Sequence, residues 1–201
     1  MYATRAIIFD IGNVLVFHDN DQLCLNLARL YELDAVEVRA HVFASESGRR
    51  AALGELTAAG MHAEFCRRFG VTANYPDFAT AFSSHFTPNT AIEPLIRSLA
   101  GRFRLLTLSN TNPMHVEYMR EHLRILDAFD DLLLSCELGL GKPQPEIYAE
   151  AVRRSGCSAA QCLFTDDVPA YVDAARAAGL KGIVFTDAAA FERDLRSRGI
   201  A

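Results

Sequence analysis

Short apolar runs that alternate with stretches of helical spacing are the feature that most constrains the fold of this chain. The runs are rich in branched and aromatic residues, as buried strands are, and stretches such as 146–155 and 170–178 repeat their apolar residues at helical spacing. Strand alternating with helix favours a parallel sheet covered by helices on both faces, with right-handed connections. The sequence therefore predicts an α/β fold with a doubly wound parallel sheet, whose strands are 5–9, 103–108, 132–135, 162–165 and 182–185.

The pattern changes between residues 17 and 88, where helical segments such as 21–33 and 56–69 follow one another with little strand signal. This segment enters directly after the first strand and its turn. Pro88 and Asn89 are typical of a linker, and a core helix is expected to begin near Ala91. We predict a core formed by residues 1–16 and 89–201, with residues 17–88 as a helical insertion.

Composition disfavours several classes of function. The 201 residues are half apolar, which supports one compact core and a modest insertion. The net charge is −5 and the basic residues are scattered, so we expect binding neither to nucleic acid nor to an anionic membrane surface. No apolar stretch approaches the roughly 20 residues of a membrane helix, and residues 1–5 lack the pattern of a signal peptide. We expect a cytoplasmic protein, monomeric or homodimeric, that acts on a small molecule.

The cysteines are odd in number, include no CxxC pair and mostly lie in apolar contexts. This pattern favours reduced thiols over a disulfide framework or a structural zinc site. The residues are Cys24, Cys66, Cys136, Cys157 and Cys162.

Polar residues follow the ends of four predicted strands. In an open parallel sheet the carboxyl ends of the strands meet at one crevice, which is where ligands bind. We therefore expect the polar side chains to gather there, although Lys142 is separated from the third strand by a short loop. The residues are Asp10, Ser109, Asn110, Lys142, Asp166 and Asp167.

Each of these residues alone has an ordinary structural interpretation. An aspartate after a strand is more often a helix cap or turn former than a catalyst. Ser109 and Asn110 could cap a helix that begins near Pro113, and Lys142 could be a surface lysine. The adjacent carboxylates of Asp166 and Asp167 are harder to explain in this way, because at a buried sheet edge they repel one another unless a cation or hydrogen-bond donors compensate them.

Taken together, the six residues supply the groups that phosphoryl transfer requires. These groups are a carboxylate nucleophile, a second carboxylate to share a hard cation, a hydroxyl and amide pair for phosphate oxygens, and a lysine. Magnesium takes oxygen ligands and bridges carboxylate and phosphate, while the lysine offsets the negative charge that would repel an anionic nucleophile from an anionic ester.

The same residues resemble the four motifs of the haloacid dehalogenase-like (HAD) hydrolases. Four motifs in this order, with a helical insertion after the first, make the resemblance specific, and it spans nearly the whole chain. The first motif is similar to that of bacterial phosphatases that act on glucose 1-phosphate. The motifs are Phe9-Asp10-Ile11-Gly12-Asn13-Val14-Leu15, Leu108-Ser109-Asn110-Thr111-Asn112, Gly141-Lys142-Pro143-Gln144-Pro145-Glu146-Ile147-Tyr148 and Phe164-Thr165-Asp166-Asp167.

The resemblance implies a Rossmann-like core and a small helical cap that closes over the site and selects the substrate. It further implies a magnesium-dependent hydrolase of small phosphomonoesters, with a sugar phosphate as one candidate. By this analogy Asp10 would attack phosphorus and form an aspartyl-phosphate, which water then hydrolyses. Asp10, the backbone carbonyl of Gly12 and Asp167 would hold Mg²⁺, with Asp166 as a second or water-mediated ligand.

The resemblance also assigns residues to the phosphate group. Ser109 and the backbone amide of Asn110 would bind phosphate oxygens, and Lys142 would neutralise the phosphate and orient Asp10.

The chain departs from the family pattern at two positions. Gly12 stands where many phosphatases of the family carry an aspartate that serves as general acid and base, a role worth roughly 10²- to 10⁴-fold in rate. His18 and Asp19 are candidates to replace it, although a solvated linker is the ordinary interpretation of both. Tyr171 stands where relatives often have asparagine.

Two other functions stay open from the sequence. A dehalogenase would use Asp10 on carbon without a metal, although the expected aromatic residue at the position of Gly12 and a halide-binding arginine are not evident. A non-catalytic phosphometabolite-binding protein would retain the fold after losing its chemistry. In the cap, Phe43, Arg49 and Arg50 could meet the leaving group, but packing of Phe43 on the core and solvation of the arginines are favoured.

Overall fold

A five-stranded parallel sheet forms the centre of the protein. The structure is a computed structural model that describes residues 3–72 and 74–200. The strand order is β5-β4-β1-β6-β7, so the chain winds outward from the central β1 to one edge and then returns to wind outward to the other. The strands are β1 (Ala6–Phe9), β4 (Arg104–Ser109), β5 (Asp131–Leu134), β6 (Cys162–Asp166) and β7 (Lys181–Val184). The predicted doubly wound α/β fold is confirmed, and each strand lies within one residue of its predicted bounds.

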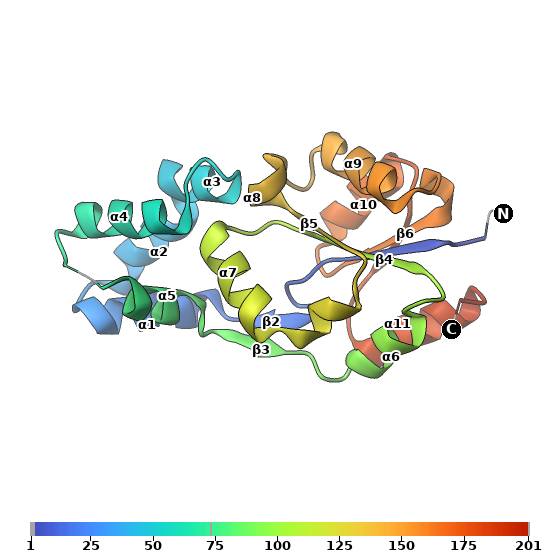
Figure 1. Ribbon diagram of the computed structural model, residues 1–201, viewed down its shortest axis with the longest axis horizontal. Helices are drawn as coiled ribbons and strands as arrows, with labels where there is room; N and C mark the ends of the chain where they lie inside the picture. Colours follow the sequence, from blue (N-terminus) through green and yellow to red (C-terminus); the bar gives the residue numbers. More distant parts are fainter. Residues whose placement is uncertain (1–2, 73, 201) are drawn as a thin grey trace.

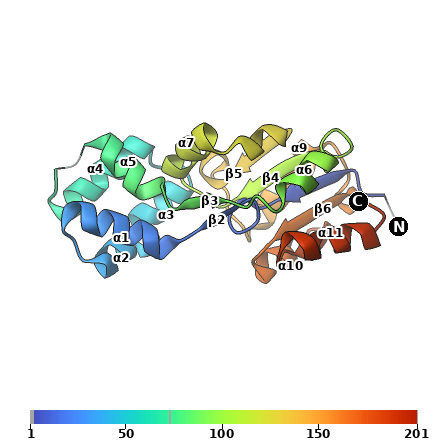
Figure 2. The same ribbon diagram turned by 90° about the horizontal axis from the view of Figure 1, so that it is seen from below.

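Helices cover both faces of this sheet (Figures 1 and 2). The strands are apolar throughout because both faces are buried: Ile7 and Phe9 of β1 point into one apolar cluster, whereas Ala6 and Ile8 point into the other. The helices of the first face are α6 (Glu93–Leu99), α7 (Pro113–His122) and α11 (Ala188–Ser197), and those of the second are α9 (Pro145–Ser155) and α10 (Pro169–Ala177). Short 3₁₀ turns, η1 (Arg124–Ala128) and η2 (Ala159–Gln161), join neighbouring elements.

The inserted segment forms a separate helical body, which we call the cap, at the left of Figure 1. Its helices enclose an apolar cluster that includes Phe65, Phe78 and Phe82, and Met114 of α7 also belongs to this cluster. The helices are α1 (Asn20–Tyr31), α2 (Ala35–Ala44), α3 (Glu46–Ala52), α4 (Ala58–Phe69) and α5 (Tyr75–Ser83).

Two short antiparallel strands join the cap to the core, β2 (Val16–His18) and β3 (Phe86–Pro88), with Val16 opposite Pro88 and His18 opposite Phe86. This ribbon was not predicted from the sequence, because three residues are too few to show the alternation of a strand. The predicted limits of the insertion, 17 and 88, fall inside the ribbon, and the division of the chain into two units stays a prediction.

The cap rests on the core at α8 (Ser135–Leu138), beside α3 in Figure 1. Gly54, at φ +73°, permits this approach, because a Cβ at that position would lie 1.8 Å from the carbonyl oxygen of Cys136. The Ser135 hydroxyl lies 2.8 Å from the carbonyl oxygen of Ala52 in the cap. Helix α8 also separates Lys142 from β5, where only a short loop was expected from the sequence.

All five cysteines carry free thiols. Within residues 3–72 and 74–200, no helix is long and apolar enough to cross a bilayer.

Candidate active site

Asp10, Lys142 and Asp166 form a buried charged cluster at the carboxyl ends of the central strands. Asp10 follows β1, where its backbone N–H donates to the Thr165 carbonyl at 2.9 Å, and Asp166 is the last residue of β6. The ammonium nitrogen of Lys142 lies 2.8 Å from Oδ1 of Asp10 and 2.6 Å from Oδ2 of Asp166. The lysine therefore links the ends of β1 and β6 by two short ion pairs.

Asp167 lies beside this cluster but has different partners from Asp166. Asp166 is fully buried, and its Oδ1 accepts the N–H of Val168 at 2.8 Å, so both of its oxygens are engaged. Asp167 lines the cavity above the sheet, and its Oδ2 accepts a hydrogen bond from Asn13 at 2.9 Å. Asn13 adopts the left-handed conformation, at φ +53°, which asparagine tolerates better than most residues.

Three carboxylates meet in this small volume, since Asp10, Asp166 and Asp167 offer oxygens that all lie within 4.8 Å of one another. Burial and the charge of Asp10 raise the pKa of Asp166 to about 6, although Lys142 acts in the opposite direction. Burial also opposes the charge of Lys142, but the two carboxylates outweigh it and hold the pKa of this lysine above its ordinary value. The three carboxylates outnumber the one ammonium and offer only oxygen ligands. This set fits a hard divalent cation such as Mg²⁺.

The predicted phosphate-binding residues lie at the end of β4 and line the same cavity. Ser109 is buried as the last residue of the strand. The amide side chain of Asn110 brackets the backbone of Lys142: it donates to the carbonyl at 2.9 Å and accepts the N–H at 2.8 Å. Neither residue caps α7, because Asn112 does so by accepting the N–H of His115. The helix-cap interpretation of Ser109 and Asn110 is therefore wrong.

The cavity above these residues has a volume of about 800 Å³ and extends from the strand ends into the cap. Five of the six polar residues predicted from the strand ends line it, and Asp166 is fully buried beneath them. Phe43 also lines this cavity and is 43% exposed, so the expected packing of this side chain on the core is wrong.

The ring of His18 lies over Gly12. A Cβ placed on Gly12 would lie 3.0 Å from both Cδ2 and Nε2 of this histidine and 3.9 Å from Oδ2 of Asp10. His18 therefore occupies the space into which a side chain at position 12 would project. Asp19 points elsewhere, because one of its oxygens caps α1 by accepting the N–H groups of Asp21 and Gln22.

Tyr171, the second departure from the family pattern, packs against the lysine. Nζ of Lys142 lies 5.1 Å from the centroid of the tyrosine ring, within the range of a cation–π contact. The backbone carbonyl of Tyr171 accepts a hydrogen bond from Tyr148 at 2.9 Å. The tyrosine thus covers the buried ion pairs.

Several residues of this cavity were not predicted from the sequence. Asn13 stands inside the first motif, so its contact with Asp167 could have been sought there. His85, before β3, and His115, in α7, also line the cavity. They come from segments that are far apart in the sequence, and no local pattern marked them.

A charged cluster at the strand ends of a doubly wound sheet, beside an inserted helical segment, defines an α/β protein that binds its ligand at a carboxylate-rich site at the edge of the sheet. A family model described as haloacid dehalogenase-like hydrolase matches residues 4–179. The chain belongs to this family.

Relatives that match this chain include two phosphate-ester hydrolases. It is 30% identical over 110 residues to flavin mononucleotide hydrolase 1 of Arabidopsis thaliana, a match that covers 54% of this chain and 44% of the relative. It is 31% identical over 110 residues to the sesquiterpene phosphatase astK of Aspergillus oryzae, covering 54% and 56%. The matches therefore span about half the length of these curated relatives.

Among solved structures, a HAD-family enzyme of Bacteroides thetaiotaomicron, crystallised as a magnesium complex, superposes with a TM-score of 0.86. The superposition covers 97% of this chain and 100% of that one at 19% identity, which shows a shared fold.

Proposed function

We propose that this protein is a magnesium-dependent phosphomonoester hydrolase that acts through an aspartyl-phosphate intermediate. The observation that carries the proposal is the position of Asp10, paired with Lys142 at 2.8 Å and surrounded by carboxylate oxygens within 4.8 Å. A buried ammonium beside a carboxylate at a sheet edge offsets the repulsion between an anionic nucleophile and an anionic ester.

In this reaction a carboxylate oxygen of Asp10 attacks phosphorus, and the bond from phosphorus to the ester oxygen breaks. Water then cleaves the acyl phosphate, which releases inorganic phosphate and restores the carboxylate. Lys142 orients Asp10 throughout, and Asp166 is a positioning residue because it fixes the ammonium at 2.6 Å. Ser109 and the backbone N–H of Asn110 would bind the phosphate oxygens.

Asp10, the backbone carbonyl of Gly12 and Asp167 would hold Mg²⁺. Asp167 would be the direct ligand because it lines the cavity, whereas Asp166 is fully buried with both oxygens engaged and would act through water at most. When bound, the ion offsets charge on the phosphoryl group.

His18 would supply the proton that the leaving alcohol needs. Its ring lies in the space that a side chain on Gly12 would fill, beside Asp10, and Asp19 is occupied as a helix cap. The proton would pass from a ring nitrogen of His18 to the ester oxygen as its bond to phosphorus breaks, and the ring would regain it from the attacking water.

The substrate is a small-molecule phosphate ester. The sequence resemblance favours a sugar phosphate such as glucose 1-phosphate, while the two relatives are named for flavin mononucleotide and for a sesquiterpene phosphate, both with larger leaving groups. A cytoplasmic location and a monomer or homodimer stay predictions from the sequence.

The test is hydrolysis of para-nitrophenyl phosphate and acetyl phosphate with Mg²⁺ present. We expect turnover that is lost in EDTA and in Asp10→Asn, whereas Asp194→Asn, which changes an exposed carboxylate on α11, retains it. Release of halide from 2-haloacids without metal would instead identify a dehalogenase. Tight binding of phosphate with no turnover of any ester would identify a non-catalytic binding protein.

A further inference from the structure

Beyond the strand ends the cavity is lined by the cap, by the β2–β3 ribbon and by α7, and we call this part the cap end. Its lining includes many apolar and aromatic side chains, together with the polar residues His41, Ser45, Glu46, Ser47 and Arg49. Phe43 stands out because it is among the few large apolar side chains of the cap that are substantially exposed, and it lies on this wall. The apolar residues that line this end include Val42, Phe43, Met61, Phe82, Phe86 and Met119.

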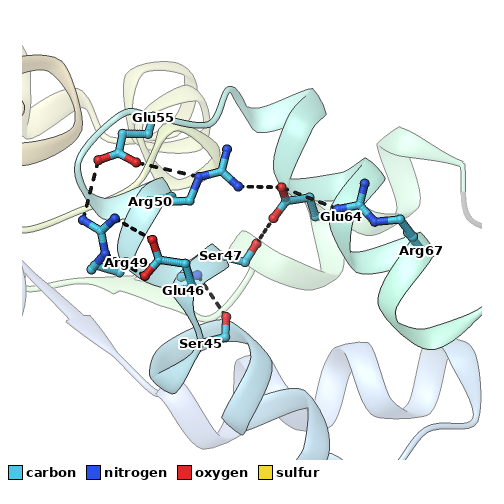
Figure 3. Close-up of polar contacts among 9 residues, drawn as sticks. Ser45, Glu46, Ser47, Arg49, Arg50, Glu55, Glu64 and Arg67 are labelled. Atoms are coloured by element: carbon cyan, nitrogen blue, oxygen red, sulfur yellow. Dashed lines mark hydrogen bonds and ion pairs between the residues drawn. The ribbon is translucent and has the colours of Figure 1, made fainter.

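The cap brings no unpaired cation to this end of the cavity, as far as its described residues extend (Figure 3). Arg49 of α3 lines the cavity but pairs with Glu46 at 2.6 Å and with Glu55 at 3.6 Å. Arg50 pairs with Glu64 at 2.9 Å and with Glu55 at 3.7 Å. The arginine charge of this wall is therefore already neutralised, and a second anionic group on a substrate would gain little there.

Two buried histidines are among the polar residues of this lining. His85 and His115 are 6% and 9% exposed, and their rings lie 5.2 Å apart. Both ring nitrogens of His85 and Nε2 of His115 lack a hydrogen-bond partner, although the Phe82 carbonyl faces both rings. Burial lowers the pKa of His85 to about 4 and that of His115 well below its ordinary value, so both rings are neutral near pH 7.

The tautomer of His115 follows from its neighbour. Oδ1 of Asn112 accepts the backbone N–H of His115 as the cap of α7, so the Asn112 amide nitrogen faces Nδ1 of the ring at 3.2 Å and donates to it. The proton of the neutral ring is therefore on Nε2. Nε2 of His115 and both ring nitrogens of His85 are therefore polar atoms buried beneath the cavity lining, with the Phe82 carbonyl near them.

We propose that the cap end of the cavity binds the leaving group of the substrate, an uncharged and mainly aromatic alcohol at least as bulky as two fused rings. This inference rests on the proposed phosphatase function and adds the class of the substrate. A cavity of about 800 Å³ is far larger than a phosphate group, and the apolar and aromatic side chains of its lining, among them the exposed Phe43, gain from contact with apolar surface.

The test compares esters whose alcohols have similar acidity but different size. We expect kcat/KM for 1-naphthyl phosphate to exceed that for phenyl phosphate about tenfold, the effect of burying one additional ring. Glucose 1-phosphate and a sugar bisphosphate should both rank below 1-naphthyl phosphate, because the first buries little apolar surface and the second adds an unpaired anion.

A variant of Phe43 and a matched control test whether the preference for 1-naphthyl phosphate arises at the cap wall. Phe43→Ala should lower the ratio of the two kcat/KM values from about ten to about two or three. Leu30→Ala changes a cap residue with the same exposure, 43%, that does not line the cavity, and it should leave the ratio unchanged.

The outcomes separate the two proposals. If para-nitrophenyl phosphate and acetyl phosphate are hydrolysed but naphthyl and phenyl phosphate are used equally, or glucose 1-phosphate is preferred, the assignment of the leaving group is wrong while the phosphatase stands. If no ester is hydrolysed, the phosphatase proposal fails, and the binding inference fails with it. A naphthyl preference that Phe43→Ala leaves intact would also overturn the assignment of this wall.

Discussion

The two ends of the cavity differ in how their residues are fixed. At the strand ends, Lys142, Asp10 and Asp166 hold one another through ion pairs of 2.6 and 2.8 Å, and the sheet register sets their spacing. At the cap end apolar side chains such as Phe43, which is partly exposed to solvent, line the cavity beside polar residues of α2 and α3 that form no such buried cluster. In the proposed function the sheet holds the reacting groups, whereas the inserted body contacts the leaving group and can vary without disturbing them.

The difference predicts that variants at the strand ends affect all esters alike. Lys142→Met should lower kcat/KM about 10³-fold for both naphthyl and phenyl phosphate, because the lysine acts on the nucleophile and the phosphate, which every ester shares. Steady-state kinetics on the two esters measures this. A fall confined to one ester would contradict the separation of the two ends.

Lys142→Met should also lower the free energy of unfolding, because it leaves two buried carboxylates without their cation. A control must therefore separate this loss of stability from the loss of activity. Removing one partner of a buried pair typically costs about 3 to 5 kcal/mol. The double variant Lys142→Met/Asp166→Asn removes one of these charges and should recover part of the stability in urea unfolding. It should recover none of the activity, which separates the catalytic effect from misfolding.

His18 lies between the two ends, and its replacement should affect esters according to their leaving group. His18→Ala should lower kcat about 100-fold for an alkyl phosphate, whose alcohol needs a proton, and only a few-fold for para-nitrophenyl phosphate. Asp19→Ala, which removes the α1 cap at a cost of about 1 kcal/mol, should show no such dependence. Equal losses on both esters would contradict the role of His18 as proton donor.

Gly12 provides a second control for His18. Gly12→Asp alone should change activity little, because its Cβ would lie 3.0 Å from the His18 ring and the two side chains compete for one space. In the His18→Ala background the same substitution has room and should restore about tenfold of the lost rate on alkyl phosphates. Failure of this rescue would indicate that the space over Gly12 is not where the proton is transferred.

The strand ends could be predicted from the sequence because their order along the chain implies their position in space. Continuous apolar runs mark strands buried on both faces, and parallel strands bring their final residues to one edge. Asp10, Ser109 and Asp167 could therefore be grouped from their places after the strands alone. The tight pair between Lys142 and Asp166 could not be predicted in this way, because α8 separates Lys142 from the end of β5.

The cap end could not be predicted in this way. Its polar residues, His85 and His115, meet only because the β2–β3 ribbon folds the end of the cap against α7. Three-residue strands and the four-residue α8 give no periodic signal. Phe43 lies on α2, whose apolar residues do not form one stripe, so its orientation is decided by tertiary packing rather than by helical periodicity.

The neutral histidines predict an acid sensitivity that the strand ends do not explain. His85 has a pKa of about 4 in the folded protein against about 6.5 when unfolded. Between these values only the unfolded chain binds the proton, so the free energy of unfolding should fall by about 1.4 kcal/mol per pH unit from about pH 6.5 down to about pH 4. His85→Phe should remove this contribution in urea unfolding measured at pH 7 and pH 5.

His115 acts in the same direction, so the variant should flatten only part of the dependence on pH. His122→Phe changes an exposed histidine that stacks on Tyr118 and should leave the dependence as in the wild type. An unchanged slope in His85→Phe would mean that His85 is not held neutral in the folded protein.

The smallest expected effect concerns the contact that joins the two regions. Oγ of Ser135 lies 2.8 Å from the Ala52 carbonyl of the cap and accepts the N–H of Thr111 at 2.9 Å. Ser135→Ala should lower the free energy of unfolding by about 1 kcal/mol and increase hydrogen exchange at α3, because one cap-to-core hydrogen bond is lost.

Ser155→Ala is the matched control, because Ser155 is similarly buried and hydrogen-bonded but lies entirely within the core. If both variants increase exchange at α3 equally, the cap is not held at Ser135, and its packing on α7 and the β2–β3 ribbon hold it instead.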